Sequence, residues 1–243
     1  MRLSIILLGI SLSATAFAAD NCATYSYCDI WGGTCATGQQ QSPIVNNAAQ
    51  RRKDDTLTKP GFFYSARVAV IITNTKTMLN VTAYKHMTMT YGGSTYTLVD
   101  FHFHTPPEHV LDVWNTPRRA AAELHLVHKK ADGATLLVAI PIFVGESNAA
   151  LSVLKLFGRP KACDSVTTGT DAFAMGALLP ANTGSYVTYI GSLTTPPCTE
   201  GVRFILMNNG ITATQDEIDV LKVGMSARPA QNNTNSVTYR VEN

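Results

Sequence analysis

The chain has 243 residues, of which 45% are hydrophobic and 15% are charged, and its formal net charge at pH 7 is +2. This length and composition argue against a disordered chain and suffice for one large domain with a buried core. The near-neutral charge and the absence of apolar runs of about 18 residues exclude the usual patterns of nucleic-acid binding, membrane-surface binding and membrane spanning.

Residues 1–18 combine a basic residue near the start, an apolar run and the small-x-small sequence Ala16-Phe17-Ala18. This pattern is typical of a secretory signal peptide cleaved after Ala18. We therefore expect an exported mature domain, residues 19–243, that is secreted or periplasmic. Residues 19–40 show no sustained period and are predicted to form an N-terminal arm over that domain.

The region from residue 68 onward reads mainly as short strands separated by turn signals. Gly92-Gly93 is typical of a tight hairpin turn that leads into the next strand. Two short helices interrupt the pattern: one over residues 147–157, capped by Ser147 or Asn148, and one from Thr214 to about Leu221. The predicted strands are residues 68–72, 79–84, 87–91, 98–109, 121–128, 135–144 and 186–190.

Residues 98–109 (LVDFHFHTPPEH) and 121–128 (AAELHLVH) hold five of the six histidines. Successive side chains of a strand point to opposite faces, so Asp100, His102 and His104 share one face of the first run. The same alternation places Tyr96 and Leu98 on this histidine face. The opposite face, which is core-like, carries Thr97, Val99, Phe101 and Phe103.

In the second run the alternation puts Glu123 and His125 on one face. If the two strands are neighbours, the imidazoles of His102, His104 and His125 converge. Three neutral imidazoles suit Zn²⁺ and leave a fourth position for water, whose pKa the metal lowers to about 7, so that hydroxide is available as a nucleophile at neutral pH. Glu123 is placed to orient the ring of His125 through its second nitrogen.

Two other interpretations of these histidines were weighed. Alternating histidines also fit an ordinary solvated strand face. His102-x-His104 followed by Glu108 matches the first half of a cupin metal motif, although Tyr96 and Asn115 stand where cupins have glycine. A cupin-like enzyme would use Fe or Mn in place of Zn.

Five motifs follow one another in a fixed order: QSPI at residues 41–44, the two histidine runs, GSLTTPP at 191–197 and RPAQ at 228–231. With these motifs the chain resembles the α-class carbonic anhydrases from about Gln41 to its C-terminus. The resemblance implies a mainly β single domain, built on a large, twisted, mostly antiparallel sheet with a few short helices. It also implies zinc on the three histidines and reversible hydration of CO₂ to bicarbonate and a proton.

The resemblance assigns further roles. Thr194 would accept a hydrogen bond from zinc-bound hydroxide and donate its own to Glu108, which makes these two residues the catalytic pair. Thr195 would help to bind bicarbonate. Asp100 stands where the family commonly has glutamine and would accept a hydrogen bond from His102. The apolar wall for CO₂ is assigned to Val127, Val138, Leu193, Val202 and Phe204, the last of which replaces the usual tryptophan.

Export permits disulfides, and all five cysteines lie in the predicted mature part. In exported members of the family the cysteine before QSPI pairs with the one after TTPP, so the resemblance implies a Cys35–Cys198 bond. The sequence leaves open the pairing of Cys22, Cys28 and Cys163.

The family's proton-shuttle histidine lies in a segment of form Asn-x-Gly-His-x-x-x-Val. Here residues 74–81 read NTKTMLNV, which places Lys76 at the glycine and Thr77 at the histidine. Without a shuttle, proton release to bulk water holds turnover to about 10³–10⁴ s⁻¹, far below the roughly 10⁶ s⁻¹ of a shuttle-equipped enzyme. We predict turnover that is limited by proton removal and rescued by buffer; the sequence leaves the position of His86 open.

A further alternative is a non-catalytic zinc-binding or adhesion module of the same fold, which arises when zinc histidines are lost. All three histidines are present together with Glu108 and Thr194, which favours the enzyme. The expected partner is a small molecule, CO₂ or bicarbonate; neither nucleic acid nor a membrane span is expected. For the oligomeric state, monomer and homodimer both remain open.

Overall fold

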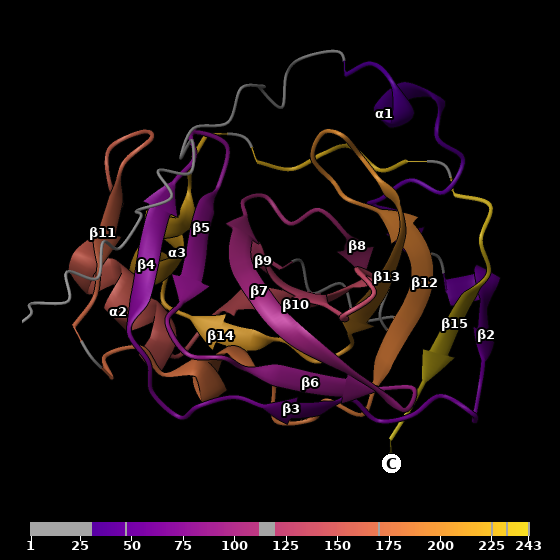
Figure 1. Cartoon of the computed structure of the whole chain (residues 1–243), viewed down its shortest axis with the longest axis horizontal. Helices are drawn as coiled ribbons and strands as arrows, with labels where there is room; N and C mark the ends of the chain where they lie inside the picture. The colour runs from indigo at the N-terminus through magenta and orange to yellow at the C-terminus, as the bar shows by residue number, and fades with distance from the viewer. Residues whose placement is uncertain are drawn as a thin grey trace, which may run out of the picture.

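The computed structural model describes residues 31–46, 48–111, 120–169, 171–224, 226–231 and 233–242. The predicted signal peptide and much of the predicted arm lie outside these residues. In the described part, strands dominate and are arranged in one 13-stranded sheet and one two-stranded sheet. Figure 1 shows β7, β9 and β10 crossing the middle of the molecule, with β4, β5 and β11 on one side and β12, β13, β15 and β2 on the other.

The main path of the large sheet runs through β11 (Ser165–Thr167), β4 (Val70–Asn74), β5 (Leu79–Ala83), β7 (Ser94–His104), β9 (Ala122–Lys129), β10 (Thr135–Val144), β13 (Glu200–Met207), β12 (Tyr186–Ser192), β15 (Val237–Arg240) and β2 (Arg51–Lys53). Off this path are β3 (Gly61–Phe63), β6 (Thr88–Tyr91) and β14 (Ile211–Ala213). The two-stranded sheet consists of β1 (Val45–Asn46) and β8 (Val110–Leu111).

Within the large sheet, the described pairs are antiparallel except β10–β13, β10–β14 and β15–β2. The predicted fold class, a mainly β domain with a large and mostly antiparallel sheet, is therefore confirmed. The strand β2 is not among the predicted strands, yet its charged residues pair with β15 at one end of the sheet. Charged side chains suit such an edge because they discourage pairing with another chain.

The helices are α1 (Thr34–Thr37), α2 (Ala149–Phe157) and α3 (Gln215–Leu221), with 3₁₀ turns η1 (Ala48–Gln50) and η2 (Met175–Leu178). Asn148 caps α2 by accepting from two backbone N–H groups, and Thr214 with Glu217 forms the predicted capping box of α3. Buried side chains of α2 and α3 belong to the same hydrophobic cluster as one face of the sheet. Figure 1 shows both helices on the side of β4, β5 and β11.

Side chains of β9 and β10 alternate between two hydrophobic clusters, one on each face of the sheet. Leu124, Leu126 and Val138 belong to the larger cluster, which α2 and α3 cover. Val127 and Leu137 belong to the smaller cluster on the opposite face. His102 and His104 of β7 and His125 of β9 lie on this second face, where no helix covers the middle of the sheet among the described residues.

The strand β7 contains an extra residue, Val99, where its pairing with β9 shifts between Leu98 and Asp100. Such a bulge reverses the alternation of side chains on its two sides. As a result, Leu98 packs against the same cluster as Phe101, and Val99 is 43% exposed. The predicted faces are therefore wrong for residues 96–99, because a strict period of two assumes uninterrupted pairing, and right from Asp100 onward.

Candidate functional site

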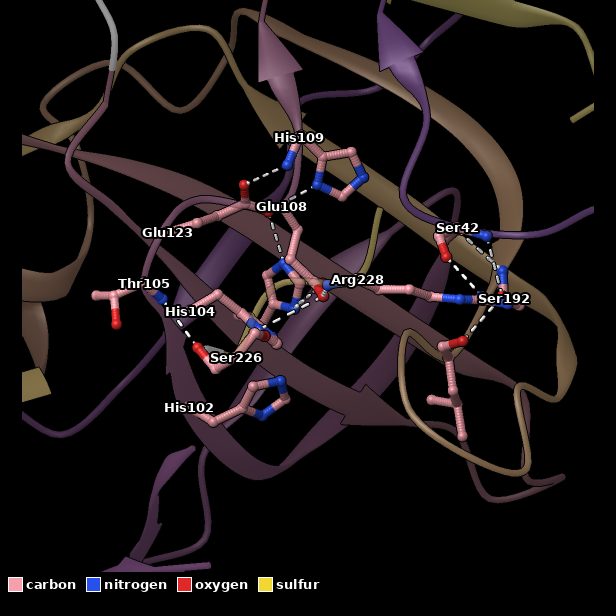
Figure 2. A network of polar contacts seen from close by, with 12 residues as sticks. Ser42, His102, His104, Thr105, Glu108, His109, Glu123, Ser192, Ser226 and Arg228 are labelled. Carbon is pink, nitrogen blue, oxygen red and sulfur yellow. Dashed lines mark hydrogen bonds and ion pairs between the residues drawn. The ribbon is translucent and has the colours of Figure 1, made fainter. Parts of the chain in front are cut away.

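The two histidine strands are neighbours in the sheet. His102 of β7 lies directly opposite His125 of β9, and His104 follows on the same face of β7. One ring nitrogen of each histidine lies within 4.8 Å of the other two, and the ring centroids are 4.5 to 5.3 Å apart. Figure 2 shows His102 next to His104, at the lower edge of the side chains drawn. The structure therefore brings the three predicted ligands together.

The ring of His102 is held by an acceptor from its own strand. Its Nδ1 donates to Oδ1 of Asp100 at 3.1 Å, and the same oxygen accepts from Nδ2 of Asn80 at 3.2 Å. Because Nδ1 of a neutral imidazole is then the protonated nitrogen, Nε2 carries the lone pair. The predicted contact between Asp100 and His102 is present, and Asn80 of β5 was not foreseen.

The other two rings are held in the same way and are buried. Nδ1 of His104 donates to the backbone carbonyl of Ser226, and Nε2 of His125 donates to Oε1 of Glu123 at 2.6 Å. Burial lowers the pKa of His104 well below its ordinary value and that of His125 to about 4, so both rings are neutral at pH 7. Nδ1 of His125 is buried and has no hydrogen-bond partner among the described residues.

Glu123 is fixed by a chain of hydrogen bonds that reaches β12. It accepts from the backbone N–H of His109 at 2.8 Å and from its Nδ1 at 2.6 Å. The hydroxyl of Tyr189 donates to Nε2 of His109 at 2.8 Å, and Ser42 lies 2.9 Å from that hydroxyl. Burial alone would raise the pKa of Glu123, but the two neighbouring histidines hold it well below its usual range. The ionised carboxylate therefore orients the ring of His125.

Glu108 lies behind the histidines and is almost completely buried. Its Oε1 accepts from the backbone N–H of Arg228 at 2.9 Å, and its carboxylate also accepts from the side chain of Thr194. Burial outweighs these hydrogen bonds and raises the pKa of Glu108 well above its usual range. The pairing of Thr194 with Glu108, which the resemblance implied, is present. Oε2 of Glu108 lies 4.0 Å from Nδ1 of His125.

A cavity of about 650 Å³ opens beside the histidines. Its lining combines polar residues, which include Asp100 and His102, with apolar and small residues. Of the residues assigned to substrate, four line it: Val127, Leu193, Thr195 and Val202. A cavity with one apolar wall next to a polar centre suits a small ligand with a reactive polar end.

The remaining two wall residues are buried beneath the surface. Phe204 is fully buried, and its ring centroid lies 6.2 Å from that of His125. The assignment of Val138 is wrong: it pairs with Leu126 and belongs to the cluster on the opposite face of the sheet. Because neighbours on a strand point to opposite faces, Leu137 takes that place and packs with Val127.

No histidine stands at the predicted shuttle position, and the local backbone fits the motif. Lys76, at the glycine position, has a φ of 73°, the left-handed region that favours glycine. Thr77 is nearly buried, and its hydroxyl lies 3.2 Å from that of Thr75, which lines the cavity. Among the described residues, His102 is the one histidine in the cavity lining.

His86 lies far from the metal ligands. Its Nε2 is 3.3 Å from the hydroxyl of Thr97, at the opposite end of β7 from His104. Since a strand rises about 3.3 Å per residue, Thr97 and His102 are roughly 16 Å apart along β7. The position that the sequence left open is therefore outside the cavity.

The predicted Cys35–Cys198 disulfide is present. It joins α1 to the turn that carries Thr194 and Thr195, and Gln41 reinforces this link by donating to the carbonyl of Cys198 at 3.2 Å. Cys163 is also in a disulfide, while Cys22 and Cys28 lie outside the described residues.

Besides Asn80, sequence reasoning missed five residues of this network: Ser42, His109, Tyr189, Ser226 and Arg228. Three of them stand inside motifs that served for recognition, namely QSPI, TPPEH and RPAQ. Ser226 lies close to the last of these motifs, and Tyr189 lies in a predicted strand. No local signal distinguishes these residues, because their roles depend on contacts between segments far apart in the chain.

Comparisons with known proteins place these features in a family. Residues 27–241 match the family model of eukaryotic-type carbonic anhydrases. A carbonic anhydrase of Pectobacterium carotovorum is 33% identical over 186 residues, which cover 76% of this chain and 71% of that protein. A carbonic anhydrase of Neisseria gonorrhoeae is 31% identical and covers 90% of this chain and 85% of that protein.

Solved structures agree in fold. An α-carbonic anhydrase of Photobacterium profundum has a TM-score of 0.75 and 32% identity, with 84% of this chain and 91% of that chain covered. Dioscorin, solved in complex with ascorbate, has a TM-score of 0.77 and 27% identity, with 86% and 89% covered. No helix among the described residues has the length and apolar character needed to cross a membrane.

Proposed function

Because the chain belongs to the eukaryotic-type carbonic anhydrase family, we propose that it catalyses the reversible hydration of CO₂ to bicarbonate and a proton at a zinc ion held by His102, His104 and His125. One observation carries the proposal. The three ring nitrogens that face one another are the ones left with a lone pair after each ring has donated its N–H to Asp100, Ser226 or Glu123.

The donor set fits zinc. Three imidazoles, two of them neutral by burial, are a common ligand set for catalytic zinc and leave a coordination position open. The buried Nδ1 of His125 supports this fit, since a polar atom at that depth costs free energy unless something binds it. When bound, Zn²⁺ would lower the pKa of a water molecule to about 7 and supply hydroxide as the nucleophile.

Glu108 and Thr194 would set the direction of attack. The hydroxyl of Thr194 donates to Glu108, so its oxygen can act only as an acceptor toward a donor in the cavity. A nucleophile that donates its hydrogen to the oxygen of Thr194 presents its lone pair to the apolar wall. The backbone N–H of Thr194 would stabilise the negative charge that develops on the substrate oxygen.

The apolar wall would hold CO₂. Val127, Leu193 and Val202 line the cavity, with Leu137 and Phe204 packed behind them. CO₂ has no N–H or O–H group to donate, so a wall without strong acceptors excludes ordered water more than it excludes the substrate. Thr195 lies on the same cavity surface and would bind the bicarbonate product.

Proton removal would limit turnover. Thr77 replaces the shuttle histidine, and His86 lies outside the cavity. We expect Thr77→His to raise turnover in dilute buffer by up to about 100-fold. At high concentrations of imidazole buffer, the turnover of the unchanged protein should approach that of the variant. The measurement is stopped-flow hydration of both proteins across buffer concentrations. Equal turnover of the two in dilute buffer would refute a missing shuttle.

Export is a separate part of the proposal. Residues 1–18 would be the signal peptide, and the mature domain would begin at residue 19, outside the cytoplasm. The disulfides of Cys35, Cys198 and Cys163 support this, because such bonds persist in oxidising compartments. N-terminal sequencing of the protein secreted by its host tests the cleavage site.

The two rival functions differ in metal and activity. The cupin-like interpretation is wrong, because the fold is that of the α-carbonic anhydrases. The non-catalytic binding module is the second candidate, and the structural neighbour dioscorin was solved in complex with a small molecule, ascorbate. Metal analysis and a hydration assay separate the enzyme from the binding module. In protein expressed with Zn, Fe and Mn supplied equally, we expect one zinc per chain. We also expect hydration activity that is lost on chelation and restored by zinc. Zinc binding without hydration would favour the binding module.

A further inference from the structure

A short segment near the C-terminus holds two parts of the site at once. The carbonyl of Ser226 accepts from Nδ1 of His104, and its Oγ accepts from the backbone N–H of Thr105 at 2.9 Å. Two residues later, the backbone N–H of Arg228 donates to Oε1 of Glu108 at 2.9 Å. Figure 2 shows Ser226 beside His104 and Arg228 beside Glu108. The position of residues 226–228 therefore sets the positions of a metal ligand and of the catalytic carboxylate.

The side chain of Arg228 anchors this segment to the N-terminal region. It is buried, and its Nη1 donates to Oε1 of Gln41 at 2.9 Å and to the carbonyl of Ser42 at 2.7 Å. Its Nη2 donates to the carbonyl of Cys35 at 2.8 Å, and its guanidinium carbon lies 5.6 Å from the ring centroid of Trp31. One planar group thus connects the segment to several points between residues 31 and 42.

Those anchor points are themselves attached to the turn that carries Thr194. Cys35 is bonded to Cys198, and Gln41 donates to the carbonyl of the same residue. The backbone N–H of Ser42 donates to Oγ of Ser192 at 3.0 Å. Arg228 therefore connects Glu108, through its backbone, with the Thr194 turn, through its side chain, although it is not among the residues that line the cavity.

We propose that Arg228 is a positioning residue that holds Glu108, Thr194 and His104 in one geometry, and this inference rests on the proposed function. Its guanidinium fork makes three hydrogen bonds to acceptors on three residues. The single nitrogen of a lysine cannot reach all three in this planar geometry, so lysine would keep the charge and lose the alignment.

The test compares Arg228→Lys with Asn233→Ala. Asn233 is a matched control because it holds the same N-terminal segment, donating to the carbonyl of Gln41 at 3.0 Å and to that of Ile190 at 3.1 Å, without touching residues 226–228. For Arg228→Lys we expect zinc affinity, measured by competition with a chelator, and kcat each to fall about tenfold with KM unchanged. Asn233→Ala should lower the Tm and leave zinc affinity and kcat unchanged.

The outcomes separate this inference from the function it rests on. If Arg228→Lys keeps the zinc affinity and kcat of the unchanged protein, or loses only what Asn233→Ala loses, Arg228 is merely structural and the inference is wrong. If Arg228→Lys does not fold, Gln41→Ala, which removes one acceptor of the guanidinium, should show a smaller loss in the same direction, and unchanged zinc affinity there overturns the inference. If the unchanged protein binds zinc but does not hydrate CO₂, the proposed function fails while zinc affinity still decides the role of Arg228.

Discussion

Two glutamates are exposed to nearly the same small extent, yet their surroundings shift their pKa values in opposite directions. Glu217, at the junction of α2 and α3, is 3% exposed and has a pKa lowered to about 2. Glu108, in the proposed metal site, is 4% exposed and has a pKa raised well above its usual range. Little of either side chain is exposed, but Glu108 lies deeper in the protein, so burial disfavours its charged form more strongly; the donors around Glu217 outweigh its burial, whereas those around Glu108 do not.

Glu217 is surrounded by donors. Its Oε1 accepts from the hydroxyls of Ser147 and Ser152, both at 2.5 Å, and its Oε2 accepts from the backbone N–H groups of Thr214 at 2.9 Å and Asn148 at 3.1 Å. These four hydrogen bonds replace those that the carboxylate would make with water in the unfolded chain. The group therefore stabilises the junction of the two helices and has little capacity left for a ligand.

Glu108 has fewer donors, and those it has belong to the site. It accepts from the backbone N–H of Arg228 and from the side chain of Thr194. A carboxylate kept short of donors costs folding free energy, and a protein retains one where it serves a function. The comparison teaches that burial alone does not distinguish a structural acid from a catalytic one, whereas the count and origin of its donors do.

The largest expected effect is that of Glu108→Gln on catalysis. The NH₂ group of a glutamine can donate to the oxygen of Thr194. The hydroxyl of Thr194 is then free to donate toward the cavity, where it previously could only accept. We expect kcat/KM for CO₂ hydration to fall about 10²–10³-fold, with the free energy of unfolding unchanged or higher because an under-solvated carboxylate is removed. Stopped-flow kinetics and urea unfolding measure the two quantities. A loss of stability without a loss of activity would reverse the roles assigned to the two glutamates.

Next in size is the effect of Glu217→Gln on stability. A glutamine oxygen in the place of Oε2 can still accept from the backbone N–H groups of Asn148 and Thr214. Its NH₂ group then faces the hydroxyls of Ser147 and Ser152, which now donate to a carboxylate oxygen and would lose that acceptor, and the remaining hydrogen bonds lose their charge assistance. We expect the free energy of unfolding to fall by about 2 kcal/mol. Hydration activity per bound zinc should stay the same, and it serves as the control. A variant as stable as the unchanged protein would show that the four hydrogen bonds contribute little.

The pH dependence of stability sharpens the comparison. Because the folded pKa of Glu217 is lowered from 4.5 to about 2, its stabilisation is complete above pH 4.5 and is lost as the pH falls toward 2. Urea unfolding of chelator-treated protein should therefore show a steeper fall of stability in this window for the unchanged protein than for Glu217→Gln. Parallel curves for the two proteins would mean that Glu217 titrates normally in the fold.

The smallest expected effect is that of Ser152→Ala. This change removes one of the two hydroxyl donors to Oε1 of Glu217 and leaves Ser147 in place. We expect the free energy of unfolding to fall by about 1 kcal/mol, and the acid-induced loss, which still begins near pH 4.5, to end at a slightly higher pH because the folded pKa of Glu217 is lowered less. Thermal unfolding at two pH values measures it. An effect equal to that of Glu217→Gln would show that the donors act as one unit.

Local sequence predicted much of the fold and the centre of the site. The strand over residues 135–144 has its predicted bounds, and the capping box at Thr214 and Glu217 is present. The strand period placed His102 and His104 on one face of their strand, and their convergence with His125 was predicted on the condition that the two strands are neighbours, which they are. Such features depend on residues within a few positions of one another, which is the range over which patterns carry information.

The misplaced features depend on pairing between distant segments. The bulge at Val99 reverses the faces of residues 96–99, and β10 turns Leu137, not Val138, toward the cluster that packs behind the cavity wall. The hydroxyls of Ser147 and Ser152 reach Glu217 from 70 and 65 residues away, and no local pattern indicates that they meet it. Pairing register and long-range donors are set by the folded sheet.

The most direct test of the account is stopped-flow CO₂ hydration by mature protein with a measured zinc content, across rising concentrations of an imidazole buffer. The account predicts hydration that is proportional to bound zinc and that climbs with buffer toward a plateau, because the site lacks a histidine shuttle. Protein with one zinc per chain that hydrates CO₂ no faster than the buffer alone would contradict the account.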